Sequence, residues 1–304
     1  MNGNQPRCGI IIIDKPEGFT SFDLCAKLRG MLKTKKIGHA GTLDPMATGV
    51  MTVLLGNAAR AAELLPVQEK RYTASFRLGI TTDTLDITGR VLSESPVCVQ
   101  REQLENALEG FRGDIMQVPP MYSAVHSDGQ RLYELARKGI EVERESRPVK
   151  IGALTLLDYD EAAGEGRLDI LCSKGTYIRS LIADIGEALG CGGVMTALRR
   201  TMASGFELSQ AHTLEDVQKL CDDGRVDEII LPVEQALSAY RKITVTPAQS
   251  VRYCNGGWLD FERLRLKEQP AQGELVCVFD SEGFLGIAKA DYELPGLQPY
   301  KRFK

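Results

Sequence analysis

The sequence predicts an α/β protein in which strands alternate with amphipathic helices, followed by a small β domain. Short apolar runs bounded by turn residues, such as GIIIID at 9–14, are typical of buried strands. Apolar residues at helical spacing follow Thr20, and after about residue 240 the pattern changes to short β-like runs. A length of 304 residues suits two domains, which we place at 1–240 and 241–304.

The elements of the first third can be justified in chain order. Thr20 and Asp23 form a capping-box pattern at the start of a helix. Residues 38–49 are rich in Gly, Thr, Asp and Pro, so we expect a loop there and a strand over 50–55. Polar and apolar residues alternate over 71–78, which predicts a half-buried strand.

The middle of the chain is expected to carry a functional insertion. A helical pattern precedes it, with Leu104, Leu108 and Phe111 on one face. Residues 113–130 break regular structure, and a basic helical segment follows to about 139. We interpret about 113–150 as a long insertion on the sheet, the kind of loop that tends to carry function.

Beyond the insertion the alternation of strands and helices resumes. Strands are expected over 149–157 and 168–172, and a helix over 176–190 that ends at its glycine. Short β-like runs at 274–280 and 284–290 then indicate the small β domain.

Composition excludes several classes of protein. Apolar residues make up 43% and charged residues 26% of the chain, as in soluble globular proteins. No apolar run approaches the ~20 residues that span a bilayer, and the N-terminus has no secretion-signal pattern. The eight cysteines form no CxxC pair and lie near no histidine at zinc spacing. We therefore expect a cytoplasmic protein with reduced thiols and no metal site.

Basic residues are concentrated locally although the net charge is −4. One cluster lies at Lys27, Arg29, Lys33, Lys35 and Lys36, and a second extends from Arg131 through Arg137 to Lys150. Such faces on a mildly acidic protein suit a polyanion gripped at a defined place. The alternative is an ordinary solvated helix face.

The stretch GHAGTLDP contains the first candidate for chemistry, Asp44. An aspartate before proline is usually a turn former. Here Gly38, His39, Gly41 and Thr42 precede it, just before a buried strand, and the glycines permit close approach of a ligand. A carboxylate held in such a loop could act as a nucleophile or a base without a cofactor.

The stretch GHAGTLDPMATGVM resembles the signature of the tRNA pseudouridine synthase B (TruB) family. Further motifs of that family follow in order: KRY (70–72), TDTLDITG (82–89), QVPPMYSA (117–124), GQRLYELARKG (129–139), SKGTYIRSL (173–181) and ALRRT (197–201). Several ordered motifs are more specific than one pattern. The resemblance implies a pseudouridine-synthase fold with a large mixed, mainly antiparallel sheet flanked by helices. From position and pattern we infer a PUA-like RNA-binding β-barrel domain at 241–304.

The same resemblance implies an activity. The protein would isomerise the T-loop uridine of tRNA, position 55 in tRNA numbering, to pseudouridine after turning the nucleotide outward. It would act on the tRNA T arm as a monomer without an obligate protein partner. The isomerisation has no net redox change and no hydrolysis, so no cofactor and no metal are expected.

Three residues would then take part most directly. Asp44 would be the catalytic aspartate, attacking the ribose or the uracil ring or removing a ribose proton. Arg179 would pair with Asp44 and keep it ionised. Tyr72 would stack on the everted uracil near C5. Without the motif context, Tyr72 would be an ordinary core residue and Arg179 a generic surface ion pair.

The remaining assignments concern the pocket and the RNA. Tyr177 and Leu198 would line the pocket, and His39 would occupy the space left by the extruded base; by default these are packing and turn residues. Contacts with the RNA backbone are expected from five basic residues: Lys15, Lys35, Lys36, Arg131 and Arg137. His126 stands where the family commonly has lysine, which puts a phosphate contact there in doubt.

Three alternatives stay open from the sequence. The first is a guide-RNA-dependent relative that works inside a protein–RNA complex, although the basic insertion favours the stand-alone form. The second is an RNA-binding or RNA-folding protein without chemistry. The third is a uracil glycosidase, which would also use an aspartate but would release free uracil.

Overall fold

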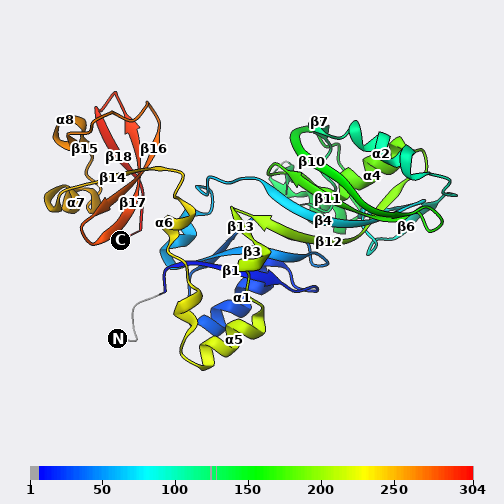
Figure 1. Ribbon diagram of the computed structural model, residues 1–304, viewed down its shortest axis with the longest axis horizontal. Coiled ribbons are helices and arrows are strands. Elements are labelled where there is room, and N and C mark those ends of the chain that lie inside the picture. The colour runs from blue at the N-terminus through cyan, green and yellow to red at the C-terminus, as the bar shows by residue number, and fades with distance from the viewer. Residues whose placement is uncertain (1–6, 124, 128, 304) are drawn as a thin grey trace.

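The computed structural model describes residues 7–123, 125–127 and 129–303 (Figure 1). Two sheets dominate it, one of nine strands and one of five. Two small two-stranded ribbons accompany them, β5 (Ile80–Thr82) with β6 (Val91–Glu94) and β8 (His126–Ser127) with β9 (Gln130–Arg131).

The large sheet follows the order β1-β3-β12-β4-β11-β10-β7, with β2 beside β3 and β13 beside β12. Its strands are β1 (Gly9–Lys15), β2 (Ile37–Ala40), β3 (Thr48–Leu55), β4 (Lys70–Leu78), β7 (Gly113–Gln117), β10 (Arg147–Asp160), β11 (Glu165–Cys172), β12 (Gly193–Ala203) and β13 (Phe206–Glu207). Only β3 and β12 pair in parallel, and every other pair is antiparallel. The predicted large, mixed, mainly antiparallel sheet is confirmed.

Helices cover this sheet in two groups (Figure 1). The α-helices of this part of the chain are α1 (Ser21–Leu32), α2 (Arg101–Glu109), α3 (Leu132–Arg137), α4 (Ile178–Ala188), α5 (Leu214–Asp222) and α6 (Val233–Ala236). Short 3₁₀ helices are η1 (Gly56–Ala61), η2 (Leu208–Gln210) and η3 (Val226–Ile229). Helices α1 and α5 pack together beside β1, whereas α4 lies against β12 and α2 against α4. Their apolar faces share one core with the strands.

Helix α1 begins where the sequence predicts. The Thr20 side chain accepts a hydrogen bond from the Asp23 backbone, and the Asp23 carboxylate accepts one from the Thr20 backbone, so the capping box is complete. Leu24, Leu28 and Leu32 are fully buried on the inner face of the helix. The predicted period of apolar residues is therefore the packed face.

Two expected loops contain strands. In the 38–49 segment, β2 occupies 37–40 and pairs with β3, which leaves a loop over 41–47 only. In the 113–130 segment, β7 pairs with β10 and forms an edge of the large sheet. Both predictions of irregular structure were wrong at these positions, because strand pairing outweighed the Gly-rich composition. The chain leaves the sheet from 118 to 146.

The five-stranded sheet is built from the end of the chain. Its order is β14-β16-β17-β18-β15, comprising β14 (Arg241–Thr244), β15 (Leu259–Asp260), β16 (Leu275–Asp280), β17 (Gly283–Asp291) and β18 (Gly296–Arg302). Helices α7 (Pro247–Cys254) and α8 (Phe261–Leu264) accompany it. Phe284 and Ile287 from this sheet share a buried cluster with Ile10 and Val50 from the large one, so the two parts pack together.

None of the helices in the described ranges has both the length and the apolar character that crossing a membrane requires. Within the same residues, no group of three or more His, Cys, Asp or Glu side chains is arranged to hold a metal ion.

The first testable consequence concerns Gly49, where β3 passes close to β12. Gly49 has φ +103°, and a Cβ there would lie 2.2 Å from the Arg200 carbonyl oxygen. Gly49→Ala should lower the free energy of unfolding by roughly 2–4 kcal/mol, from steric overlap and backbone strain together. Urea denaturation measures this change.

Gly190→Ala is the matched control, because Gly190 has φ +77° and open space around its Cβ position. It should cost only about 1 kcal/mol, the strain of a positive φ without overlap. Equal losses for the two variants would contradict the close approach of the two strands.

Candidate active site

Asp44 lies in the loop over 41–47, and polar side chains fix the main chain of this loop from three sides. The Arg200 guanidinium is fully buried and donates to the carbonyls of Gly41 (3.1 Å) and Thr42 (3.3 Å). The Ser21 hydroxyl donates to the Leu43 carbonyl (3.1 Å) and accepts from the Leu43 amide (2.9 Å). These hydrogen bonds fix the main chain of the loop at Gly41, Thr42 and Leu43.

Lys15 of β1 also binds the main chain of this loop. Its ammonium donates to the carbonyls of Pro16 (2.9 Å), Phe19 (2.7 Å) and Pro45 (3.2 Å), and its side chain has no exposed surface. Burial lowers the pKa of Lys15 to about 8, against the opposing effect of the Asp44 charge. The prediction that Lys15 contacts the RNA backbone is wrong, because its ammonium is buried and donates its hydrogen bonds to carbonyls of the protein.

Arg179 forms an ion pair with Asp44, as the resemblance of the sequence motifs to the family implied. Its Nε lies 2.9 Å from an Asp44 carboxylate oxygen, and its side chain is only 6% exposed. The other nitrogens donate to the carbonyls of Thr84 (3.0 Å) and Tyr122 (2.9 Å). With all three nitrogens engaged, the guanidinium has one orientation, and it fixes the carboxylate facing it.

Asp86 stands on the other side of Arg179, 3.8 Å from the guanidinium. It is buried and accepts hydrogen bonds from the hydroxyls of Thr84 (2.8 Å) and Thr88 (2.6 Å). Arg179 thus lies between two carboxylates, only one of which faces the cavity.

Opposing effects set the pKa of Asp44. Burial raises it and is the largest effect, Arg179 lowers it through its charge and hydrogen bond, and the Asp86 charge raises it. The balance is a pKa above the ordinary value for aspartate. The side chain is still 34% exposed, through the cavity. Loss of Arg179 would leave burial unopposed by its nearest cation.

The exposed side of Asp44 opens into a cavity of about 230 Å³. The cavity is lined by Thr42, Leu43, Asp44, Lys70, Tyr72, Tyr122, Ser123, Gly175, Thr176, Tyr177, Ile178, Arg179 and Leu198. Five of the six residues predicted for catalysis and substrate binding are thus brought together. They come from the loop before β3, from β4, from the start of α4 and from β12.

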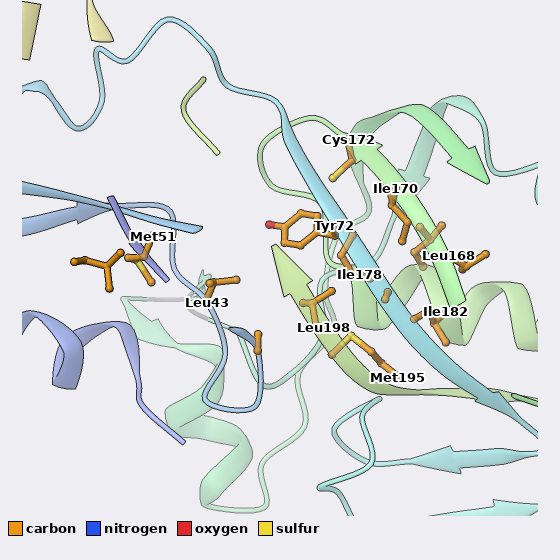
Figure 2. Close-up of a cluster of buried hydrophobic side chains, with 14 of the residues drawn as sticks. Leu43, Met51, Tyr72, Leu168, Ile170, Cys172, Ile178, Ile182, Met195 and Leu198 are labelled. Carbon is orange, nitrogen blue, oxygen red and sulfur yellow. The ribbon is translucent and has the colours of Figure 1, made fainter. Parts of the chain in front are cut away.

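Tyr72 provides an aromatic wall of this cavity. Its ring projects from β4, beside Leu43 and Leu198 (Figure 2). It is 5% exposed, and the nearby Arg200 guanidinium acts on its phenol. Burial raises the pKa of the Tyr72 phenol, so the hydroxyl keeps its proton at neutral pH.

Tyr177 is positioned by the edge strand β7. Gln117, the last residue of β7, accepts from the Tyr177 amide (2.8 Å) and donates to the Tyr177 carbonyl (3.0 Å). Gln117 is buried and was not predicted as a site residue. Its place at the start of the QVPPMYSA motif was a signal that could have found it.

His39 is the predicted site residue that the structure places outside the cavity lining. It lies on β2 opposite Val53 of β3. Its Nδ1 is buried and has no hydrogen-bond partner among the residues described. Burial, with a smaller effect of Arg200, lowers the pKa of His39, so the imidazole is neutral.

The other predicted RNA contacts lie on the surface. Lys35, Lys36, Arg131 and Arg137 are exposed. The guanidinium carbons of Arg131 and Arg137 lie 6.0 and 5.4 Å from the Tyr133 ring centroid, so two cations flank one aromatic ring. Cations interleaved with an aromatic side chain suit an RNA backbone and an unstacked base.

The cavity is distinguished by its chemistry and not by its size. A larger hollow of about 410 Å³ lies against β4, β10 and β11. Its ion pair, Arg167 with Asp158, is about half exposed on both sides. Such a pair is screened by water, whereas Arg179 is almost completely removed from it.

Comparison with known proteins identifies the family of this chain. Residues 29–178 match the family described as TruB family pseudouridylate synthase (N terminal domain), and residues 179–238 match the tRNA pseudouridylate synthase B C-terminal domain. The chain belongs to the TruB family of pseudouridylate synthases. It is therefore an isomerase, and the resemblance found in the sequence is confirmed.

TruB relatives match over nearly the whole chain. The tRNA pseudouridine synthase B of Stutzerimonas stutzeri is 45% identical over 92% of this chain and 91% of its own length. The tRNA pseudouridine synthase B of Chromobacterium violaceum is 43% identical over 93% of this chain and 90% of its own length. Among solved structures, one titled as a Cbf5-Nop10-Gar1 complex has a TM-score of 0.72 at 26% identity and covers 97% of this chain and 85% of its own. The predicted fold class is confirmed.

The second prediction concerns the pH dependence of pseudouridine formation. Arg179→Gln removes the cation that lowers the Asp44 pKa, so the acidic limb of the pH–rate profile should move to higher pH by at least about one unit. At pH 7 the rate should fall, and it should recover partly as the pH rises. Single-turnover rates between pH 5.5 and 9 measure this shift.

Asp86→Asn supplies the opposite control, because the Asp86 charge raises the Asp44 pKa. In that variant the acidic limb should move to lower pH. If both variants move the limb in the same direction, the ionisation of Asp44 does not control the rate.

Proposed function

We propose that the protein is a stand-alone tRNA pseudouridine synthase that isomerises the T-loop uridine at tRNA position 55. The observation that carries this proposal is the Asp44–Arg179 pair, 2.9 Å apart, facing a cavity walled by Tyr72 and Leu198. A carboxylate beside an aromatic and an apolar wall suits a pyrimidine held by stacking.

Asp44 is the catalytic residue in this proposal. The bond between ribose C1′ and uracil N1 breaks, a bond between C1′ and C5 forms, the proton on C5 leaves and N1 gains a proton. Asp44 acts by attacking the ribose or the ring, or by removing a ribose proton. In each route the carboxylate must be ionised, which is the contribution of Arg179.

Tyr72 stacks on the uracil, while Tyr177 and Leu198 complete the walls. Because burial keeps the Tyr72 phenol protonated, its hydroxyl is available as a hydrogen-bond donor and its ring as an apolar plate. His39, on β2 just before the Asp44 loop, fills the space that the extruded base leaves in the RNA. The uridine reaches the cavity only by leaving the RNA stack.

The insertion over about 113–150 clamps the RNA in this proposal, through its part outside the sheet, 118–146. It contributes Tyr122 and Ser123 to the cavity, and Arg131 and Arg137 lie on its exposed side. Lys35 and Lys36 extend the basic face. Residues 241–304 form a PUA-like RNA-binding domain that completes the grip on the T arm.

Two observations favour the stand-alone form over a guide-RNA-dependent one. The tRNA pseudouridine synthase B of Stutzerimonas stutzeri is 45% identical, whereas the chain in the Cbf5-Nop10-Gar1 complex is 26% identical. The basic clamp is also part of this chain. We propose that the protein acts in the cytoplasm as a monomer, without an obligate protein partner.

The third prediction tests the catalytic assignment. Asp44→Asn keeps the size and a hydrogen-bond acceptor but removes the charge, so pseudouridine formation on an unmodified tRNA transcript should fall by ~10²–10⁴-fold or more. A pseudouridine-specific adduct read by mass spectrometry measures it and maps the modified position.

Asp169→Asn is the matched control, since Asp169 pairs with Arg71 at the surface and should be dispensable. Pseudouridine formation by Asp44→Asn at the wild-type rate would refute the assignment. Release of free uracil would identify a glycosidase, and tRNA binding without modification by the wild type would identify a binding protein.

The fourth prediction tests the basic face. Reversing the charge of both Lys35 and Lys36 to Glu should weaken tRNA binding and flatten the slope of log K against log salt by roughly 1–2, because fewer counterions are released. Filter binding from 50 to 250 mM KCl measures the slope. Lys219→Glu is the control, because Lys219 is an exposed residue of α5, and it should leave the salt slope unchanged. An unchanged slope in the double variant would mean that Lys35 and Lys36 only face solvent.

A further inference from the structure

Lys70 lines the active-site cavity and has no part in the reaction described above. It is the first residue of β4, two residues before Tyr72. Side chains two apart on a strand project from the same face, so the ammonium lies on the side of the sheet that holds the Tyr72 ring.

No carboxylate of the described residues pairs with Lys70, although Asp44 lines the same cavity. Among the described residues, no hydrogen bond or salt bridge engages its Nζ. The charged groups that act on it most strongly are the cations Arg200 and Lys174. The neighbouring Cys172 thiol has a pKa raised to about 11 by burial, so it is neutral and provides no compensation.

The cavity as a whole has an excess of positive charge. Four cations line it or lie directly behind its wall: Lys15, Lys70, Arg179 and Arg200. Two carboxylates face them, Asp44 and Asp86, and both interact with Arg179. Lys15 and Arg200 are bound to main-chain carbonyls, which leaves Lys70 as the cation here with a free donor.

A half-buried ammonium without an acceptor is unfavourable, and burial accordingly lowers the pKa of Lys70. An anionic ligand removes this cost by pairing with it. The amine lies beside Gly41, where a Cβ would be 3.3 Å from Nζ, so the absence of a side chain there leaves room for it. This contact puts the charge over the start of the Asp44 loop.

We propose that Lys70 is a substrate-binding residue that pairs with a phosphate next to the everted uridine. The proposal rests on the function proposed above, since it requires a single nucleotide turned into this cavity. The walls of Tyr72 and Leu198 suit the base, whereas Lys70 supplies the full charge that a phosphodiester requires. Lys70 thus fixes the backbone on one side of the base and sets its depth in the cavity.

The test combines Lys70→Met with RNA in which one phosphate is neutral. The substrates are T-arm RNAs carrying a methylphosphonate on the 5′ or the 3′ side of the target uridine, with a 2′-O-methyl group on the adjacent ribose. The same 2′-O-methyl RNAs with natural phosphates are the references. Equilibrium binding and single-turnover kinetics are measured for each.

For natural RNA, Lys70→Met should raise Kd and KM by roughly 10- to 100-fold and change kcat little, as expected for loss of a charge-assisted hydrogen bond. Lys70→Arg should recover most of the affinity, and Lys219→Met should behave as wild type. One of the two methylphosphonates should weaken wild-type binding by a similar factor and should cause no further loss in Lys70→Met.

Three results would overturn the proposal. The first is that Lys70→Met and a methylphosphonate weaken binding by fully additive amounts of free energy. The second is that neither methylphosphonate weakens binding by the wild type. The third is that Lys70→Met lowers kcat and leaves KM unchanged. The wild-type comparison needs no substitution, so it remains decisive if Lys70→Met fails to fold. A wild type that binds these RNAs with the predicted phosphate dependence but forms no pseudouridine would refute the proposed function and leave the phosphate contact standing.

Discussion

One carboxylate lies inside a partly enclosed cavity, and the groups around Asp44 act on its ionisation in opposite directions. Burial alone would favour the protonated acid. Arg179 opposes it at 2.9 Å, and Arg179 is itself fixed by Asp86, Thr84 and Tyr122. Segments far apart in the sequence therefore converge on a single charge.

The main chain of the Asp44 loop is held by the same kind of interaction. Arg200, Ser21 and Lys15 bind its amide and carbonyl groups from β12, α1 and β1. Lys15 and Arg200 are buried cations, and neither forms a salt bridge with a carboxylate of the described residues. Their charge contributes to the positive potential of the cavity, which suits a polyanionic substrate.

Much of this could be predicted from the sequence. The alternation over 71–78 placed Tyr72 on the buried face of a strand, and the capping box fixed the start of α1. The Asp44–Arg179 pairing came from the family motifs, because residues 135 positions apart carry no local signal of contact.

The errors have physical causes. Lysine is almost always exposed, so Lys15 was expected on the RNA-facing surface, although it is buried. In ALRRT, the period of a strand places Arg199 and Arg200 on opposite faces of the sheet but does not indicate which face is buried. The β-bulges in β12 also shift the register, so the buried arginine is harder to predict. Strand β7 was missed because an edge strand needs a partner that only the fold supplies.

The full engagement of Arg179 has a consequence for how binding energy is used. Its three nitrogens are bound by groups of the protein itself, so the Asp44–Arg179 pair needs little reorganisation when RNA binds. The cost of assembling this polar cluster falls on folding. The favourable free energy of docking a tRNA is then available to unstack and rotate one nucleotide.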